Sequence, residues 1–262
     1  MVKSTMVKGF DKFKQFFAPH SDSFIVIGGT AMQLHGNEGG FTPRVTQDID
    51  ILVIVENMSA AFTADFHAFL REGQYDCYMA KDPEGSRKPR FYRFIKPKNE
   101  AFPTRIELLS SPLLPPPEGM LYMSLPDEPE ESMSAIVLDR PYYEFAKANT
   151  TSINEIPCLN RDALMVFKSV AYLNLMNEYE TTGERLRLHD AKKHRKDVLA
   201  LAGTIPPSDV TTVPEEIAER LRTFASYVES TLAEWQGILD SLNDPTGNIE
   251  DYLIAFRRHF AL

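Results

Sequence analysis

Apolar and polar positions follow two different periods along the chain, and the change of period divides it. In residues 1–111, short apolar runs bounded by Gly, Asp and Ser predict strands. These are expected at 24–27, 47–55, 75–79, 91–95 and 105–109. Ser59 is a suitable N-cap for a helix that runs to Arg71, with Gly73 at its end. The aromatic spacing of residues 6–17 predicts an amphipathic helix packed on this domain.

From residue 160 onward, apolar residues recur every three or four positions, as they do on helices. Asn160 is a candidate cap for the first helix, and Gly203 is expected to end a second one that begins near Leu188. A capping-box pattern at 212–215 predicts a long helix that continues to Leu239. The last predicted helix covers 249–260.

The segment between these regions is rich in Pro and acidic residues, especially over 112–132, so regular structure throughout is excluded. Short strands are predicted beyond it, at 134–139, 142–148 and 153–159. The organisation expected is therefore an α/β (α+β) mixed-sheet core domain over 1–111. An excursion with short strands over 112–159 completes that domain, and an α-helical C-terminal domain covers 160–262.

Charge is unevenly spread and limits the choice of partners. Residues 1–111 carry 14 Lys and Arg against 13 Asp and Glu, whereas the remainder carries 14 against 24. An acidic second half argues against broad duplex DNA binding, which needs a basic face. No apolar run approaches the roughly 20 residues that cross a bilayer, and the N-terminal segment lacks the features of a signal peptide. The two cysteines form no C-x-x-C pair, so we expect a reduced, cytoplasmic setting without membrane attachment.

The candidate chemistry lies in the segment 24–55. A strand runs into Gly28-Gly29-Thr30, and a later strand opens with Asp48 and Asp50 on one face, roughly 7 Å apart. Glycines leave room for a phosphate to approach the backbone, and a helix N-terminus supplies free N–H groups. Carboxylates repel a triphosphate unless Mg²⁺ lies between the carboxylates and the phosphates. The combination predicts nucleotide chemistry, whereas P-loop, Ser-hydrolase and His-zinc motifs are absent from the sequence.

The pattern G-G-T-A, L-H-G and R-x-T-x-D-x-D, with Arg44 as its arginine, resembles the nucleotidyltransferases of the DNA polymerase beta superfamily. It is most similar to the abortive-infection (AbiE-type) toxin branch. The resemblance implies a mixed-sheet nucleotidyltransferase fold followed by a helical domain. It also implies an NTP substrate, a toxin-like activity and a potential antitoxin partner.

Further site residues follow from this resemblance. The superfamily takes a third acid from a strand beside the D-x-D strand, and Glu107 is the residue that fits. The alternative explanations for Glu107 are a salt bridge to Arg105 and a charge on an edge strand. The family's helical domain presents a Lys and a Lys-Asp pair to the nucleotide, which correspond to Lys168 and to Lys196-Asp197. The expected metal ligands and catalytic residues are then Asp48, Asp50 and Glu107. The expected nucleotide-binding residues are Gly28, Gly29, Thr30, Arg44, Lys168, Lys196 and Asp197.

The reaction expected is transfer of a nucleoside monophosphate from an NTP to an acceptor hydroxyl. Two Mg²⁺ ions, or Mn²⁺ in their place, would assist it. The acceptor is left open between RNA, protein and a small molecule. One alternative is an antibiotic-type small-molecule nucleotidyltransferase. Another is a non-catalytic scaffold that binds nucleotide or protein, which is favoured by Ala200, where the family often has an acid, and by the longer loop at 37–43.

Overall fold

The computed structural model describes residues 6–39, 41–79, 90–110, 122–124, 139–242, 244 and 246–262. This part of the chain divides into two units. The first takes its described residues from 1–37, 44–130 and 147–160, and the second from 38–43, 131–146 and 161–262. No helix among the described residues is long and apolar enough to cross a membrane.

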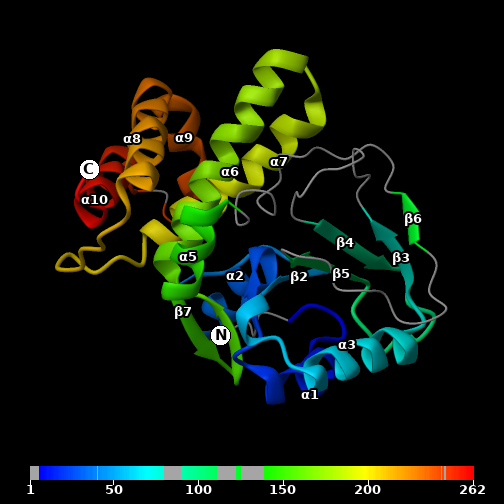
Figure 1. Ribbon diagram of the computed structural model, residues 1–262. Coiled ribbons are helices and arrows are strands. Elements are labelled where there is room, and N and C mark those ends of the chain that lie inside the picture. Colours follow the sequence, from blue (N-terminus) through cyan, green and yellow to red (C-terminus); the bar gives the residue numbers. More distant parts are fainter. Residues whose placement is uncertain are drawn as a thin grey trace. The chain divides into compact units, whose positions relative to one another are not determined.

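A mixed sheet forms the centre of the first unit, with eight strands among the described residues (Figure 1). The strands are β1 (Phe24–Ile27), β2 (Asp48–Val53), β3 (Asp76–Met79), β4 (Arg90–Ile95), β5 (Arg105–Ser110), β6 (Tyr122–Ser124), β7 (Thr150–Ile153) and β8 (Ile156–Leu159). Their order in the sheet is β6-β3-β4-β5-β2-β1-β8-β7. The central strand β2 pairs antiparallel with β1 and parallel with β5. The predicted mixed sheet and its five N-terminal strands are confirmed.

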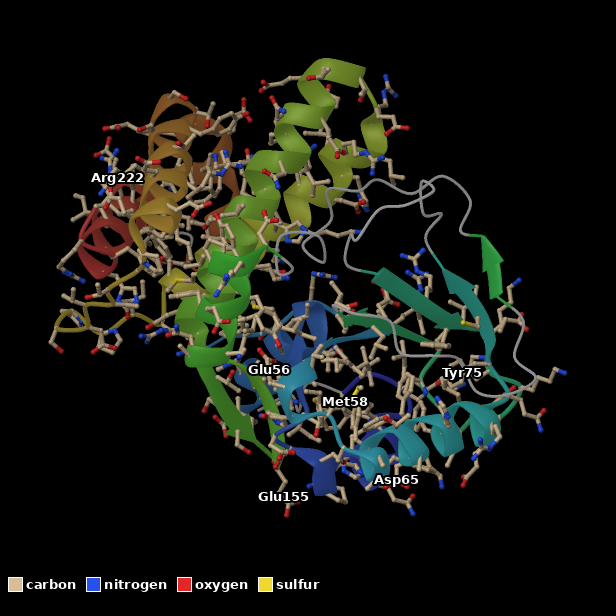
Figure 2. The ribbon with its side chains drawn as sticks, viewed as in Figure 1. Glu56, Met58, Asp65, Tyr75, Glu155 and Arg222 are labelled. Atoms are coloured by element: carbon tan, nitrogen blue, oxygen red, sulfur yellow. The ribbon has the colours of Figure 1, made fainter. Side chains whose placement is uncertain are left out.

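Three α-helices accompany this sheet: α1 (Phe10–Phe17), α2 (Gly28–Glu38) and α3 (Ala60–Gly73). The short 3-10 turns η1 (Ala18–His20) and η2 (Val55–Asn57) connect them to neighbouring elements. Ser59 caps α3 as predicted, because its side chain accepts a hydrogen bond from the Phe62 N–H. On the same helix the Asp65 carboxylate lies 2.8 Å from Nε2 of His20, while Tyr75, after the helix, donates to the Pro103 carbonyl at 2.6 Å. Figure 2 labels Asp65 and Tyr75.

Helix α1 packs against α3 through aromatic side chains, which explains the aromatic spacing of the N-terminal segment. Phe13 is fully buried, and its ring lies 4.6 Å from Phe17, 5.8 Å from Phe24 and 6.5 Å from Phe69, between ring centroids. Aromatic side chains bury large apolar areas, so this cluster is a main source of stability for the unit.

The second unit is helical. Its elements are α5 (Arg140–Ala148), whose last two residues belong to the first unit, α6 (Arg161–Thr182), α7 (Arg185–Ala202), α8 (Glu215–Ser230), α9 (Leu232–Leu239), the 3-10 turn η3 (Asp240–Leu242) and α10 (Ile249–His259). Helices α6 and α7 run side by side (Figure 1). The helical C-terminal region is therefore as predicted.

Three local predictions fail in this part of the chain. Residues 142–148 form helix α5 rather than a strand, because Tyr142, Phe145 and Ala146 make a buried stripe of helical period. The expected capping box is absent, since α8 begins after Pro214 without a side-chain cap. The long helix to Leu239 breaks at Thr231, whose hydroxyl donates to the Tyr227 carbonyl at 2.7 Å. The strand predicted at 134–139 lies, except for Asp139, outside the described residues.

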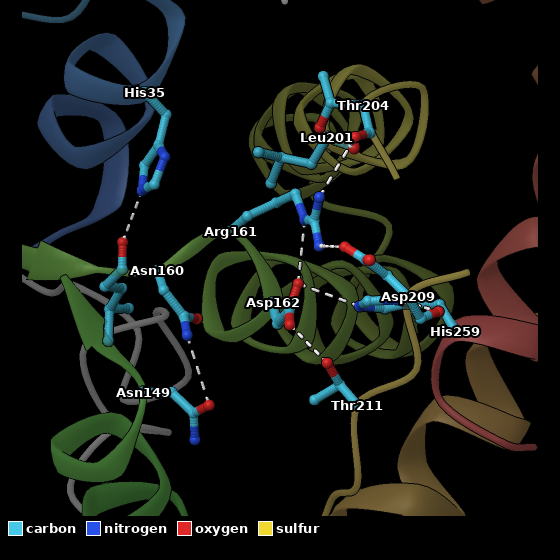
Figure 3. Close-up of polar contacts among 11 residues, drawn as sticks. His35, Asn149, Asn160, Arg161, Asp162, Leu201, Thr204, Asp209, Thr211 and His259 are labelled. Atoms are coloured by element: carbon cyan, nitrogen blue, oxygen red, sulfur yellow. Dashed lines mark hydrogen bonds and ion pairs between the residues drawn. The ribbon is translucent and has the colours of Figure 1, made fainter. Parts of the chain in front are cut away.

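A network of hydrogen bonds and ion pairs surrounds the first residues of α6 (Figure 3). Asp162 accepts hydrogen bonds from Thr211 at 2.5 Å and from Arg161 at 3.0 Å, and the buried His259 lies 3.0 Å from it. Burial alone would raise the pKa of Asp162, but the hydrogen bonds from His259, Thr211 and Arg161 outweigh it and hold that pKa well below its usual range. The carboxylate thereby ties α10 and residue 211 to α6.

The aromatic packing of α1 generates a prediction for stability. Phe13→Ala should lower the free energy of unfolding by about 3–5 kcal/mol, because it leaves a cavity among rings that cannot close over it. Phe16→Ala, at a half-buried position of the same helix, is the control and should cost clearly less. Urea unfolding followed by circular dichroism measures both, and equal losses would contradict the central place given to Phe13.

Candidate active site

Strand β2 carries the two carboxylates of the D-x-D pattern. Asp48 and Asp50 are half-buried, and they alternate with Ile49 and Ile51, which are buried. The alternation follows from the strand period of two, so both carboxylates lie on one face of the sheet. The apolar neighbours anchor the strand, and the acids stay accessible to a ligand.

The neighbouring strand brings the third acid next to them. In the parallel pairing of β2 with β5, Asp48 is opposite Arg105 and Asp50 is opposite Glu107. Directly paired residues place their side chains on the same face, within about 5 Å at Cβ in a typical sheet. The position predicted for Glu107, beside the D-x-D strand, is therefore the one the structure has.

The glycine turn lies at the junction of β1 and α2, and β1 is the strand on the other side of β2. Gly28 has a φ of +68°, which favours glycine. A Cβ on Gly29 would meet the Thr46 hydroxyl oxygen at 2.8 Å, so a side chain there has no space. The same Cβ position is 3.4 Å from Nη2 of Arg44. The structure thus places the Arg44 guanidinium beside the glycine turn.

Thr30 connects the turn to the acids. Its side chain is fully buried and its hydroxyl donates to the Asp48 carbonyl oxygen at 2.6 Å. This bond fixes the start of α2 against the start of β2. In this arrangement the Thr30 hydroxyl positions the turn through a bond to the backbone of β2.

Two arginines lie among the acids. Arg93 of β4 is opposite Glu107 in the antiparallel pairing, and its Nε and Nη2 are both 2.7 Å from Oε1 of Glu107. Arg105 approaches Asp48 at 3.3 Å and Glu107 at 3.7 Å through one nitrogen, Nη1. Guanidinium groups suit such pairing because they present several donors in a fixed plane. The salt bridge to Arg105 that the sequence suggested is present, and the stronger partner of Glu107 is Arg93.

The surroundings of Glu107 favour its neutral form. Burial raises the pKa of Glu107 to about 8, and the negative charges of Asp50 and Asp48 act in the same direction, against Arg93 and Arg105. Like-charged carboxylates this close carry an electrostatic cost that a bound cation would relieve. The arrangement therefore has the electrostatic character of a cation site.

The chemistry of the donors fits Mg²⁺ only in part. Two carboxylates on one face, each with solvent access, are the kind of protein ligands that Mg²⁺ takes together with substrate phosphates. Within the described ranges, however, no group of three or more His, Cys, Asp or Glu converges so that it could hold a metal. Asp48 and Asp50 fit the ion as a pair, and Arg93 holds one oxygen of Glu107, Oε1.

The predicted residues of the helical domain lie in the second unit. Lys168 of α6 and Asp197 of α7 are buried, and they form an ion pair at 2.6 Å. Lys196, the neighbour of Asp197, is half-buried, and Ala200 is buried. Lys168 and Asp197 thus join two helices, and of the three charged residues predicted here Lys196 is the least buried.

Arg93 is the site residue that sequence reasoning missed. A basic residue inside the run Phe91–Ile95 is a weak signal, because exposed strands often carry one. Its partner follows only from the pairing register of β4 with β5, which residues 96–104 determine.

A glycine turn at the end of β1, opposite paired acids on β2 and a third acid on β5, defines the nucleotidyltransferase class of fold, here followed by a helical region. The comparison with protein families agrees: the model described as "Nucleotidyl transferase AbiEii toxin, Type IV TA system" matches residues 15–245. The chain therefore belongs to the AbiEii nucleotidyl transferase toxin family. Membership indicates nucleotidyl transfer within a toxin–antitoxin system. No curated protein and no solved structure matches the chain.

The raised pKa of Glu107 generates a prediction about pH. Since the folded-state pKa of about 8 exceeds the ordinary 4.5, the folded chain loses stability as pH rises between these values. Glu107→Gln removes this titration. The free energy of unfolding of the variant, relative to that of wild type, should therefore increase by roughly 1 kcal/mol per pH unit between pH 5 and pH 8. Urea unfolding of metal-free protein at both pH values measures this, and a difference independent of pH would contradict it.

The buried ion pair between Lys168 of α6 and Asp197 of α7 generates a prediction about stability. Lys168→Met should destabilise the chain by about 3–5 kcal/mol, because it removes the cation that lies 2.6 Å from the buried Asp197 carboxylate. The double variant Lys168→Met/Asp197→Leu should recover most of that loss, which a double-mutant cycle in urea measures. A single variant as stable as wild type would show that the pair is not formed in solution.

Proposed function

We propose that this chain is a Mg²⁺-dependent nucleotidyltransferase that moves a nucleoside monophosphate from an NTP to an acceptor hydroxyl. The observation that carries the proposal is the half-buried pair Asp48 and Asp50 beside the glycine turn, with Asp50 in register with Glu107. Membership of the AbiEii family supports it. An in-line transfer of this kind breaks the bond between the α- and β-phosphates and releases pyrophosphate.

Each group of residues has a role in binding or orientation. Asp48 and Asp50 would hold the Mg²⁺, or Mn²⁺ in its place. When bound, this ion neutralises the triphosphate and polarises the reacting phosphoryl group. The backbone N–H groups of Gly28 and Gly29, at the start of α2, would bind phosphate oxygens, helped by the helix dipole. Arg44 would add positive charge at the same turn. Catalysis would then consist mainly of positioning and electrostatic stabilisation.

The helical unit contributes in two ways. Lys196 would offset phosphate charge, whereas Lys168 and Asp197 would keep the helix that carries Lys196 in place. Both roles depend on the ion pair between α6 and α7.

The charges on α7 favour an anionic acceptor. On α7, Arg185, Lys192 and Lys196 recur at helical spacing, and within the described part of the chain no ion pair engages them. The other cations of this helix are paired, for example Lys193 with Asp190 at 2.7 Å. A row of unpaired cations suits the phosphates of RNA better than a cationic small molecule. Transfer to RNA, in a system with an antitoxin, is thus preferred over transfer to a drug or to a protein.

The main test uses isosteric changes of the acids. Asp48→Asn and Asp50→Asn should each lower transfer of labelled NMP by roughly 100-fold or more, because the amide is a poor ligand for Mg²⁺. Asp76→Asn, which changes a carboxylate of β3 outside the site, is the matched control and should keep wild-type transfer.

The assay offers labelled NTPs with RNA, protein and small-molecule acceptors, and expression toxicity relieved by Asp50→Ala gives a second readout. Unchanged labelling of every acceptor in both Asn variants would contradict the enzyme assignment. Tight NTP binding without pyrophosphate release, in Mg²⁺ and in Mn²⁺, would favour a non-catalytic scaffold.

A further inference from the structure

The two arginines beside the acids of the site are held differently. Arg93 retains 13% of its side-chain exposure, and two of its nitrogens lie 2.7 Å from Glu107. Arg105 retains 40%, and its contacts with Asp48 and Glu107 are longer, at 3.3 Å and 3.7 Å. An exposed ion pair with long contacts contributes little stability and is easily broken. Arg105 can therefore change partners at small cost, whereas Arg93 is fixed.

The guanidinium of Arg105 also has donors that its present contacts do not use. Both contacts, with Asp48 and with Glu107, run through the single nitrogen Nη1. Among the residues that the structure describes, no hydrogen bond or ion pair engages Nε or Nη2 of Arg105. These two nitrogens form one edge of a planar group, and such an edge binds two oxygens of a phosphate side by side. Arg105 thus presents a phosphate-binding edge beside the acids.

The sheet places Arg105 on the other side of Asp48 from the glycine turn. Strand β2 lies between β5 and β1, and Asp48 is the direct partner of Arg105. On β1, Ile27 is paired antiparallel with Asp50, so the glycines that follow it come level with Asp48. The bond from the Thr30 hydroxyl to the Asp48 carbonyl agrees with this level. Neighbouring strands are about 4.8 Å apart, so a polyphosphate that reaches from the glycine turn across Asp48 extends toward Arg105.

Arg105 competes for Asp48 with any divalent ion that binds there. Nη1 lies 3.3 Å from Oδ2 of Asp48, so an ion on that oxygen would repel the guanidinium at short range. Because the Arg105–Asp48 pair is exposed and weak, Arg105 would leave the carboxylate and keep its positive charge close by. The phosphates of a bound nucleotide supply the anion that Arg105 then lacks.

We propose that Arg105 is a phosphate-binding residue of the nucleotide site: it pairs with Asp48 before a divalent ion binds, and it moves to a phosphate of the NTP once the ion takes Asp48. This proposal rests on the function proposed above and deepens it. The group that Arg105 recognises is a pair of non-bridging phosphate oxygens. The alternative is a salt bridge that only stabilises the two strands.

The test uses Arg105→Gln and measures two affinities separately. Electron paramagnetic resonance follows the binding of Mn²⁺ alone, and calorimetry in Mg²⁺ follows the α,β-methylene analogues of ATP, GTP, CTP and UTP. The two affinities should change in opposite directions. Mn²⁺ alone should bind roughly threefold or more tightly, because a competing cation is gone. The analogue that wild type binds best should bind roughly tenfold or more weakly, because a charge-assisted contact is lost.

A purely structural salt bridge does not produce this pair of opposite changes. Unchanged affinity of Arg105→Gln for the nucleotide analogue, or weaker binding of Mn²⁺ alone, would overturn the proposal. Arg71→Gln is the matched control, because Arg71 is an exposed arginine of α3 that no ion pair engages within the described ranges. It should bind both ligands as wild type does.

A conservative variant separates charge from geometry. Arg105→Lys keeps the positive charge and loses the planar fork, so it should bind the nucleotide analogue roughly threefold or more weakly than wild type and more tightly than Arg105→Gln. Circular dichroism checks the folding of each variant. Should Arg105→Gln fail to fold, Arg105→Lys decides alone, and wild-type affinity for the analogue in that variant would overturn the proposal.

The outcome also distinguishes this inference from the function on which it rests. NMP transfer by wild type, together with unchanged nucleotide affinity in Arg105→Gln, would overturn the role given to Arg105 and leave the enzyme assignment intact. The opposite changes in affinity, with no transfer to any acceptor, would support that role and overturn the catalytic assignment. A chain that binds none of the four analogues contradicts both.

Discussion

The parallel pairing of β2 with β5 is the constraint on which the candidate site depends. Because side chains alternate along both strands, this register places Asp50 beside Glu107 and Asp48 beside Arg105. A shift by one residue would turn one set of side chains to the opposite face and bury carboxylates among Ile49, Ile51 and their neighbours. The apolar positions that anchor the sheet therefore fix the chemistry as well as the fold.

The arginines around these paired strands offset part of the negative charge of the acids. Three carboxylates in two adjacent rows repel one another, and Arg93 and Arg105 offset part of this repulsion. The acids of the D-x-D pair are half-buried, whereas Glu107 is buried and its Oε1 is held by Arg93.

The sequence predicted those features that depend on local period. The strands at 24–27 and 105–109, the D-x-D face and the Ser59 cap follow from residues close together in the chain, and the structure has them. Features set by distant contacts were not predictable in the same way. The burial of Lys168 depends on Asp197, 29 residues away, and the partner of Glu107 depends on the turn between β4 and β5. The strand expected at 142–148 is a helix because its aromatic residues pack at helical spacing.

The most direct test of the central claim is a crystal structure with Mn²⁺ and a non-transferable NTP analogue, analysed by anomalous scattering. The account predicts a manganese peak between the carboxylates of Asp48 and Asp50, with the triphosphate along the backbone of Gly28 and Gly29. A peak elsewhere, or a nucleotide bound away from the glycine turn, would contradict it.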